Sequence, residues 1–253
     1  MSPTSPLLTI AGLAIFLAIL GIAAQTQFGL FNGGASGSAA EAAFTQELSP
    51  GDVLHIYVES YRRYGPKFSQ IVDGSGIPTE DLTREAWWEV GDDLTIHRSV
   101  ARTFDASGAP LSELRYEDGT ERSVNLVTGD IVDVVQREAL AARGPQGLIQ
   151  MQQEGYMASG ASIVQETPTM VILEMEEDLP SEARADIDSE SWSVPYINDL
   201  RPLSRFRRVT FHTGDEPGWH VQTFARTEGG VLVRISEATF KFDVLDEMPA
   251  GVR

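Results

Sequence analysis

The 253-residue chain contains no cysteine. Disulfide bonds, thiolate metal sites, cysteine nucleophiles and lipid anchors carried on cysteine are therefore excluded. Positive charge is also scarce, because 19 lysines and arginines stand against 37 aspartates and glutamates and leave a net charge of -18 at pH 7. Such a surface repels phosphate backbones, so nucleic acid is not expected as a partner.

Motifs of the common enzyme classes are also lacking, since no P-loop, dinucleotide fingerprint, G-x-S-x-G or H-E-x-x-H is present. His55 and His97 lie singly in predicted strands, and neither has a nucleophile at motif spacing. A hydrolase that uses either histidine is the least favoured hypothesis. We therefore expect no enzyme activity and no cofactor.

Two other histidines, His212 and His220, flank a predicted turn. A symmetric hairpin would set them opposite each other, at the distance that a shared metal ion requires. A third ligand would have to be Asp215 or Glu216 in the turn itself. Ordinary surface histidines are the favoured interpretation, so no metal site is predicted here.

The acidic segment 174–191 is predicted to be a solvated loop. Its Asp186 begins a sequence that superficially resembles a calcium loop, but Ser191 occupies the sixth position, where glycine is needed. An EF-hand is therefore rejected, and loose calcium binding is the alternative to a plain charge run.

An uncharged stretch of eighteen residues runs from Leu7 to Ala24. As a helix it would be about 27 Å long, close to the hydrocarbon thickness of a bilayer. No basic residue precedes it, which favours an uncleaved signal anchor over a cleaved signal peptide. Acidic residues follow it, so we expect the N-terminus in the cytoplasm and the large domain outside.

Three regions follow from this interpretation. Residues 1–30 are predicted to hold the transmembrane anchor, and residues 31–50 a flexible linker that contains the sequence NGGASGS. Residues 51–253 are predicted to form an extracytoplasmic antiparallel β domain. The expected localisation is the cell membrane, with a single membrane pass.

The outer domain is predicted to be mainly β, a curved antiparallel meander, or half-barrel, with a short helical insertion. Runs rich in β-branched and aromatic residues alternate with turn-forming clusters. Short links between the runs favour antiparallel neighbours. The predicted strands are 52–61, 86–91, 95–104, 111–117, 121–127, 131–136, 161–166, 169–176, 203–213, 219–227 and 230–244.

Local signals refine this prediction at three places. Asp118-Gly119 is typical of a tight hairpin turn, because both residues accept a positive φ. Apolar residues change parity along 230–244, which predicts a β-bulge near Ser236-Glu237. The helix is expected at 137–143, ending at Gly144 and Pro145, with one or two further turns at 146–154.

Methionines gather around this helical insertion. A helix laid over a curved sheet with adaptable side chains between them could line a pocket for an apolar ligand. The candidate ligand-binding residues are Leu148, Met151, Met157 and Met170. The alternative interpretation is that they fill gaps in the core beneath the helix.

The sequence also predicts to which face of a strand the side chains of two further clusters point. Trp87 and Trp88 are adjacent on a strand and must face opposite sides of the sheet. Arg205 and Arg207 point one way and Arg208 the other, so we expect these arginines to pair with the excess carboxylates and not to form one anion patch.

The tethered antiparallel meander, its helical insertion and its final strand ending in FDVLDEMPAGV resemble the half-barrel of periplasmic lipoprotein-carrier and sigma-regulator-binding proteins. The resemblance covers about residues 52–250. It implies a concave apolar face, covered by helices, that holds acyl chains or a segment of a partner protein. The leading hypothesis is thus a membrane-anchored binding domain for a lipid-like ligand or an envelope protein. The alternative is a structural or sensor subunit of a membrane complex.

Overall fold

The computed structural model describes residues 48–63, 79–178, 202–227 and 229–252. The predicted anchor at Leu7 to Ala24 and most of the linker at 31–50 lie outside these residues, as does most of the acidic segment. Within the part of the chain that is described, no helix is long and apolar enough to cross a membrane.

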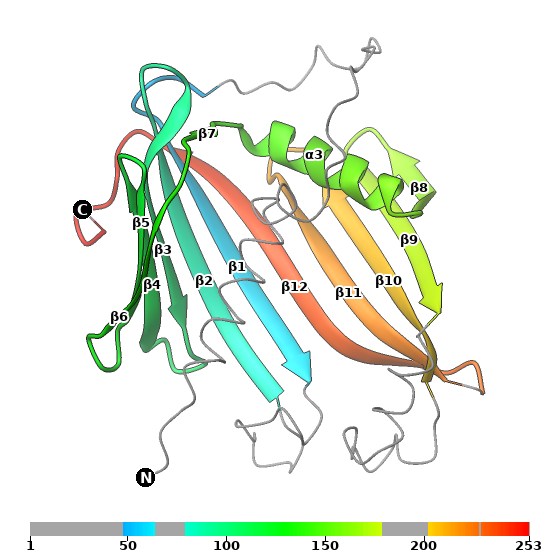
Figure 1. Ribbon diagram of the computed structural model, residues 1–253. Helices are drawn as coiled ribbons and strands as arrows, with labels where there is room; N and C mark the ends of the chain where they lie inside the picture. Colours follow the sequence, from blue (N-terminus) through cyan, green and yellow to red (C-terminus); the bar gives the residue numbers. More distant parts are fainter. Residues whose placement is uncertain (1–47, 64–78, 179–201, 228, 253) are drawn as a thin grey trace. The chain divides into compact units, whose positions relative to one another are not determined.

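Twelve strands and one helix make up the described residues (Figure 1). The helix is α3 (Pro145–Ala158). The strands are β1 (Val53–Arg63), β2 (Thr79–Val90), β3 (Thr95–Phe104), β4 (Pro110–Glu117), β5 (Thr120–Asn125), β6 (Ile131–Gln136), β7 (Leu140–Ala141), β8 (Ser162–Thr167), β9 (Met170–Asp178), β10 (Pro202–His212), β11 (Gly218–Thr227) and β12 (Leu232–Leu245).

All strand pairs are antiparallel and form one open sheet in the order β6-β5-β4-β3-β2-β1-β12-β11-β10-β9-β8, with β7 paired to β3. The predicted antiparallel, mainly β fold is therefore confirmed. A simple meander is not, because β1 pairs with the last strand, β12, as well as with β2. Two meanders extend outward from this central pair.

The sheet is curved. In Figure 1 the strands from β12 to β9 are seen face on, whereas β3 to β6 are seen nearly edge on. Local irregularities accompany this curvature, since the β11–β12 register skips Ile235 between the pairs Thr223–Ser236 and Phe224–Arg234. The predicted bulge thus lies one residue before Ser236.

The turns follow their sequence signals closely. Asp118 and Gly119 have φ values of 47° and 82°, and they join β4 to β5 as the hairpin prediction required. Strand β2 begins at Thr79, well before the predicted start at residue 86, because its first half is polar and lacks the apolar run that marks the second half.

The helix lies at a different place from the one predicted. Residues 137–143 are not helical, and within them Leu140 and Ala141 form β7. Helix α3 begins at Pro145, where the fixed φ and missing N–H of proline suit a first helical turn. The further turns expected at 146–154 therefore belong to the main helix. The Gly144-Pro145 pair was interpreted as the end of one helix, but it is the start of this one.

The sheet has two different faces, as the alternation predicts. We call the face on which α3 packs the inner face and the opposite one the outer face. Leu54, Ile56 and Val58 of β1 point to the inner face, and their neighbours on the other parity point to the outer face. Trp88 and Trp87 divide in the same way, as expected, and both are buried.

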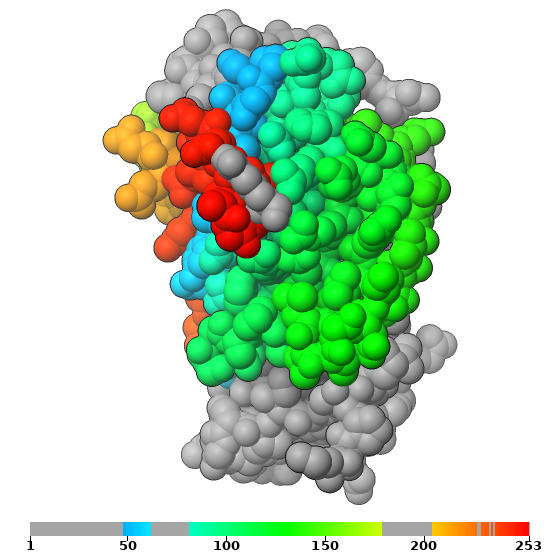
Figure 2. All heavy atoms as spheres, turned by 90° about the vertical axis from the view of Figure 1, so that its left-hand side faces the viewer, coloured from blue at the N-terminus to red at the C-terminus, as the bar shows by residue number. Residues whose placement is uncertain are grey.

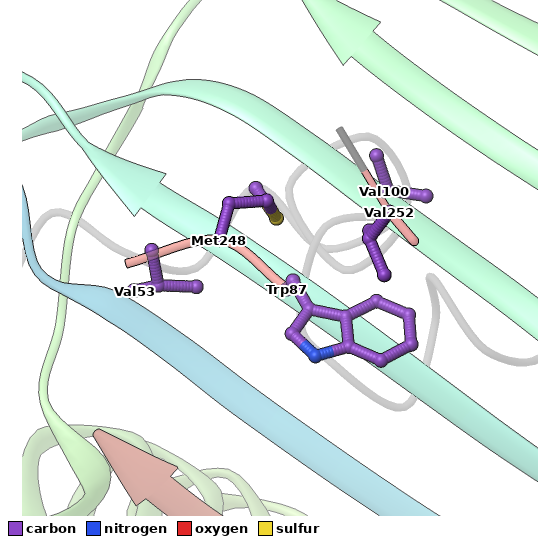
Figure 3. Packing of buried hydrophobic residues seen from close by; sticks show 5 residues of the cluster. All are labelled: Val53, Trp87, Val100, Met248 and Val252. Atoms are coloured by element: carbon purple, nitrogen blue, oxygen red, sulfur yellow. The ribbon is translucent and has the colours of Figure 1, made fainter. Parts of the chain in front are cut away.

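A small apolar cluster lies on the outer face beneath residues 246–252, which we call the C-terminal tail. Met248 and Val252 of the tail pack on Val53, Trp87 and Val100 (Figure 3). In Figure 2 the tail, in red, lies beside β1 and β2.

A hydrogen bond holds this tail in place. Arg102 on β3 donates from Nη2 to the Gly251 carbonyl oxygen at 3.0 Å. The tail therefore contacts the sheet through both apolar side chains and a polar group of its own backbone.

Gly218 at the start of β11 provides a test of the strand packing. A Cβ there would lie 2.2 Å from the Phe240 carbonyl oxygen. We expect Gly218→Ala to lower the free energy of unfolding by about 2 kcal/mol or more, since backbone must shift to accept the methyl group. Urea unfolding followed by circular dichroism measures the change.

Gly214→Ala is the matched control in the same hairpin. Its Cβ would meet Thr169 at 3.6 Å, an ordinary contact, so its unfolding midpoint should stay close to that of the original chain. Equal stability of the two variants would contradict the close approach of β11 and β12.

Candidate functional site

The inner face is a continuous apolar surface that extends across the sheet. The cross-strand register places buried side chains from six neighbouring strands on this one face. They include Leu54, Ile56, Val58, Leu82, Ala86, Trp88, Leu173, Met175, Val209, Phe211, Trp219, Ala225, Phe240 and Phe242. An apolar face of this extent is normally covered by a second layer.

Aromatic rings form the centre of the inner face. The ring of Trp219 stacks on Phe240 at 4.7 Å between centroids, and it lies 5.0 Å from Phe242 and 6.1 Å from Phe211. Tyr156 of α3 meets Phe211 edge to face at 6.2 Å. Such pairs stabilise the packing beyond the effect of their buried area.

Helix α3 packs on one side of this surface. It contacts β9 and β11, its Tyr156 meets Phe211 of β10, and its Leu148 and Ile149 are buried. Gln146 fixes the start of the helix, because its Nε2 donates to the Thr213 carbonyl oxygen at 3.2 Å. The apolar residues of the inner face continue beyond α3 onto β12, β1 and β2.

One row of small side chains on the inner face is less buried than its neighbours. Ser60, Ala238 and Val221 are paired across β1, β12 and β11, and each is half-buried. We call these three residues the central row. Beside it, Arg84 donates from Nη1 to the Ser60 hydroxyl at 2.8 Å.

A second arginine, Arg207, lies on the other side of the central row. Its guanidinium lies over the Tyr156 ring at 5.9 Å and its Nη1 is 3.8 Å from the Met175 sulfur. Burial raises the pKa of the Tyr156 phenol, and the charge of Arg207 opposes part of that rise.

The four residues predicted to bind a ligand do not gather at one place. Leu148 is buried and Met151 half-buried on α3, whereas Met157 is 43% exposed. Met170 pairs with His212 and so points to the outer face. Ligand binding by these residues stays a prediction.

The aromatic residues of the inner face were not among the predicted ligand-binding residues. Their signal in the sequence was the alternation within the last three long strands, with Phe211, Trp219, Phe240 and Phe242 each on the apolar parity. That alternation was used to predict strands but not to locate a site.

The histidines form no metal cluster among the residues that the structure describes. His212 pairs with Gly218 and not with His220, so the symmetric hairpin expected for a shared ion is wrong. The imidazole Nε2 of His220 is instead 2.7 Å from Glu237 Oε1.

His55 lies on the outer face, stacked on Trp87 at 5.3 Å, with Glu85 Oε2 3.4 Å from its Nε2. His97 is the residue skipped in the β2–β3 register, and its Nε2 is 3.9 Å from Glu89 Oε2. Within the described contacts, neither imidazole is hydrogen-bonded to a serine, threonine or tyrosine hydroxyl. The geometry therefore adds nothing to the hydrolase hypothesis.

Arginine–carboxylate pairs tie β9, β10 and β11 together. On the outer face Arg208 contacts Glu174 and Arg226 contacts Glu176. Arg205 lies on the inner parity near the start of β10, and it pairs with Glu177.

The expected pairing with carboxylates is thus confirmed for Arg205 and Arg208. Arg207 differs, because its contacts are to neutral groups.

Glu113 is the most buried carboxylate in the ion pairs of the described residues, and it accepts hydrogen bonds from Arg102 and Arg115. Burial by itself would raise the pKa of Glu113. The hydrogen bonds from Arg115 and Arg102 outweigh this effect and hold that pKa below its usual value of 4.5.

These features define an open, half-barrel-like antiparallel sheet with one apolar face. No family model matches the chain, and no curated protein matches it either. The resemblance to the lipoprotein-carrier proteins is therefore not confirmed by a family match.

Solved structures give only distant matches. The Rv2717c protein of M. tuberculosis is 13% identical with a TM-score of 0.26, covering 74% of this chain and 91% of its own. An uncharacterized conserved protein from Thermus thermophilus is 8% identical with a TM-score of 0.24, covering 78% and 83%. A β-barrel-like DUF1849 protein from Brucella abortus is 9% identical with a TM-score of 0.19, covering 76% and 97%. Scores this low carry no argument about this chain.

The charge on Glu113 makes stability depend on pH. Because its pKa is lowered by folding, Glu113 stabilises the fold above about pH 4.5, and this contribution is lost as pH falls through the folded pKa. We expect Glu113→Gln to cost about 1 kcal/mol at pH 7, after allowance for solvent screening. The difference from the original chain should shrink in unfolding curves below about pH 4.5.

Glu117→Gln is the control, since Glu117 is exposed further along the same face of β4 and has no ion pair within the described residues. If Glu113→Gln lowered the free energy of unfolding equally at every pH, the shape of the Glu113 side chain, and not its charge, would stabilise this position.

Proposed function

We propose that the protein is a membrane-anchored, extracytoplasmic binding protein that holds an apolar, lipid-like ligand against its inner face. The observation that supports this proposal is the half-buried central row, Ser60, Ala238 and Val221, within an apolar inner face that extends from β9 to β2. Because these three side chains are less buried than the rest of the face, they can contact a ligand of matching apolar character.

An acyl chain suits this surface for a simple energetic reason. Each buried methylene group contributes about 0.8 kcal/mol to the free energy of binding. A long acyl chain therefore needs only a continuous strip of apolar surface, which we call the track. The central row offers such a track, because Ser60, Ala238 and Val221 carry small side chains and are less buried than the rings beside them.

A bulky residue in the central row tests the proposal. We expect Ala238→Trp to weaken binding of oleyl alcohol by about tenfold or more, since an indole would occupy the track. Displacement of the fluorescent probe N-phenyl-1-naphthylamine from the purified full-length protein measures the affinity.

The matched control is Thr239→Trp on the next residue of β12. Thr239 is also half-buried but points to the outer face, so its substitution should leave the affinity unchanged. If the original chain binds neither the probe nor oleyl alcohol, or if both tryptophan variants bind as it does, the inner face is not a lipid site.

The anchor is the second part of the proposal. The uncharged sequence Leu7 to Ala24 is long enough for one membrane pass. We expect the expressed full chain to stay in the membrane pellet after carbonate extraction, and protease added outside the cell to digest its β domain. Release of a shortened chain into the soluble fraction would show cleavage instead of anchoring.

A further inference from the structure

Arg207 has an unusual position among the arginines of the structure. Eight described arginines contact a carboxylate; they are Arg98, Arg102, Arg115, Arg137, Arg205, Arg208, Arg226 and Arg234. Arg207 is half-buried on the apolar inner face, and no carboxylate of the described residues pairs with it.

The neutral contacts of Arg207 use little of its binding capacity. A guanidinium has five N–H donors, and the Met175 sulfur is a weak acceptor for one of them. The Tyr156 ring attracts the charge through its face but accepts no ordinary hydrogen bond there. A partly buried cation with unused donors is costly unless an anion pairs with it.

The register explains why the neighbouring strands supply no anion directly. Arg207 lies opposite Met175 on β9, and Glu174 and Glu176 on either side of Met175 point to the outer face. On β11 the residue opposite Arg207 is Thr223, which is buried. The positions that face Arg207 are therefore neutral on both neighbouring strands.

The inner parity of β9 carries a single carboxylate, Glu177, two residues from Met175. Arg205 already holds this carboxylate, since its Nε donates to Glu177 Oε2 at 3.0 Å. The pair is thus neutral as a unit and leaves Arg207 without a carboxylate among the residues that the structure describes.

Arg207 also lies at the end of the apolar track. Thr223 is two residues from Val221 of the central row, and Ser236 beside it is two residues from Ala238. From β10, which carries Arg207, to Ser60 on β1 the face crosses three strand spacings, roughly 14 Å at about 4.8 Å each. This length is close to the roughly 15 Å that acyl chains span in one bilayer leaflet.

We propose that Arg207 binds the anionic head group of an amphiphilic ligand whose acyl chain lies along the central row. This inference rests on the proposed function, because the chain must bind to the inner face for its head group to reach Arg207. The shared chemistry is a single acidic group, carboxylate or phosphate, on an acyl chain. A guanidinium recognises either through paired N–H donors.

The net charge of the protein makes the proposal easy to distinguish from general attraction. A net charge of -18 repels anionic ligands as a class. A preference for a charged lipid over a neutral one of equal chain length must therefore come from a local site.

The experiment compares oleate, oleyl phosphate and oleyl alcohol by displacement of N-phenyl-1-naphthylamine from the full chain. We expect one of the acids to bind about tenfold more tightly than the alcohol, as a charge-assisted hydrogen bond in a partly buried site would give. The acid that binds more tightly identifies the head group. Inorganic phosphate should not displace either acid, because it has no acyl chain.

Arg207→Gln should remove the preference for the acid while leaving the affinity for oleyl alcohol unchanged. Arg208→Gln is the matched control, since Arg208 is the next residue, points to the outer face and pairs with Glu174. Arg207→Lys should restore part of the preference because it keeps the charge. Unfolding midpoints of the three variants confirm that each one folds.

The outcomes separate this inference from the proposed function. Equal binding of acids and alcohol by the original chain would overturn the head-group site and leave the proposed function standing. If Arg207→Gln lowered the affinity for the acids and for oleyl alcohol alike, the head-group site would also be overturned, because Arg207 would then act by packing. Failure of the original chain to bind any of the three lipids would overturn both.

Discussion

The pairing of β1 with β12 is the interaction on which the rest of this fold depends. Ten consecutive residue pairs join them, from Val53–Leu245 to Arg62–Ser236, although nearly the whole domain separates them in the sequence. Without this ladder the meander β1 to β6 and the meander β8 to β12 would be two separate sheets. With it the inner face is continuous, and the aromatic rings of β10, β11 and β12 adjoin the aliphatic side chains of β1.

Much of this architecture could be predicted from local patterns. Alternation assigned Leu54, Ile56 and Val58 to one face, turn residues located the hairpins, and a change of parity predicted the bulge that occurs at Ile235. The β1–β12 pair could not be predicted in this way, because contacts between distant segments leave no periodicity in either one. The helix was misplaced for a related reason: Pro145 ends a preceding helix as readily as it begins a following one, and local sequence does not decide between them.

The site was less predictable than the fold because it depends on register. Methionine content indicated residues near α3, but Met170 points to the outer face, since it pairs with His212. Strand parity predicted that Arg207 points to the same face as Arg205. It could not predict which side chains of the neighbouring strands face Arg207. A shift of one residue between β9 and β10 would have placed Glu174 or Glu176 opposite Arg207. The register between β9 and β10 therefore decides whether a carboxylate faces Arg207. The sequence of β10 alone does not determine this register.

The distribution of charge over the two faces follows from the same constraint. Ion pairs such as Arg102–Glu113 and Arg226–Glu176 occupy the outer face, where water and neighbouring strands satisfy both charges. The apolar cluster on that face is closed by the C-terminal tail, so it offers no second surface to an apolar ligand. The inner face is apolar by contrast, and it includes the half-buried charge of Arg207, for which the described residues supply no carboxylate. A cation beside an apolar row makes the two ends of that row chemically different, which apolar side chains by themselves cannot do.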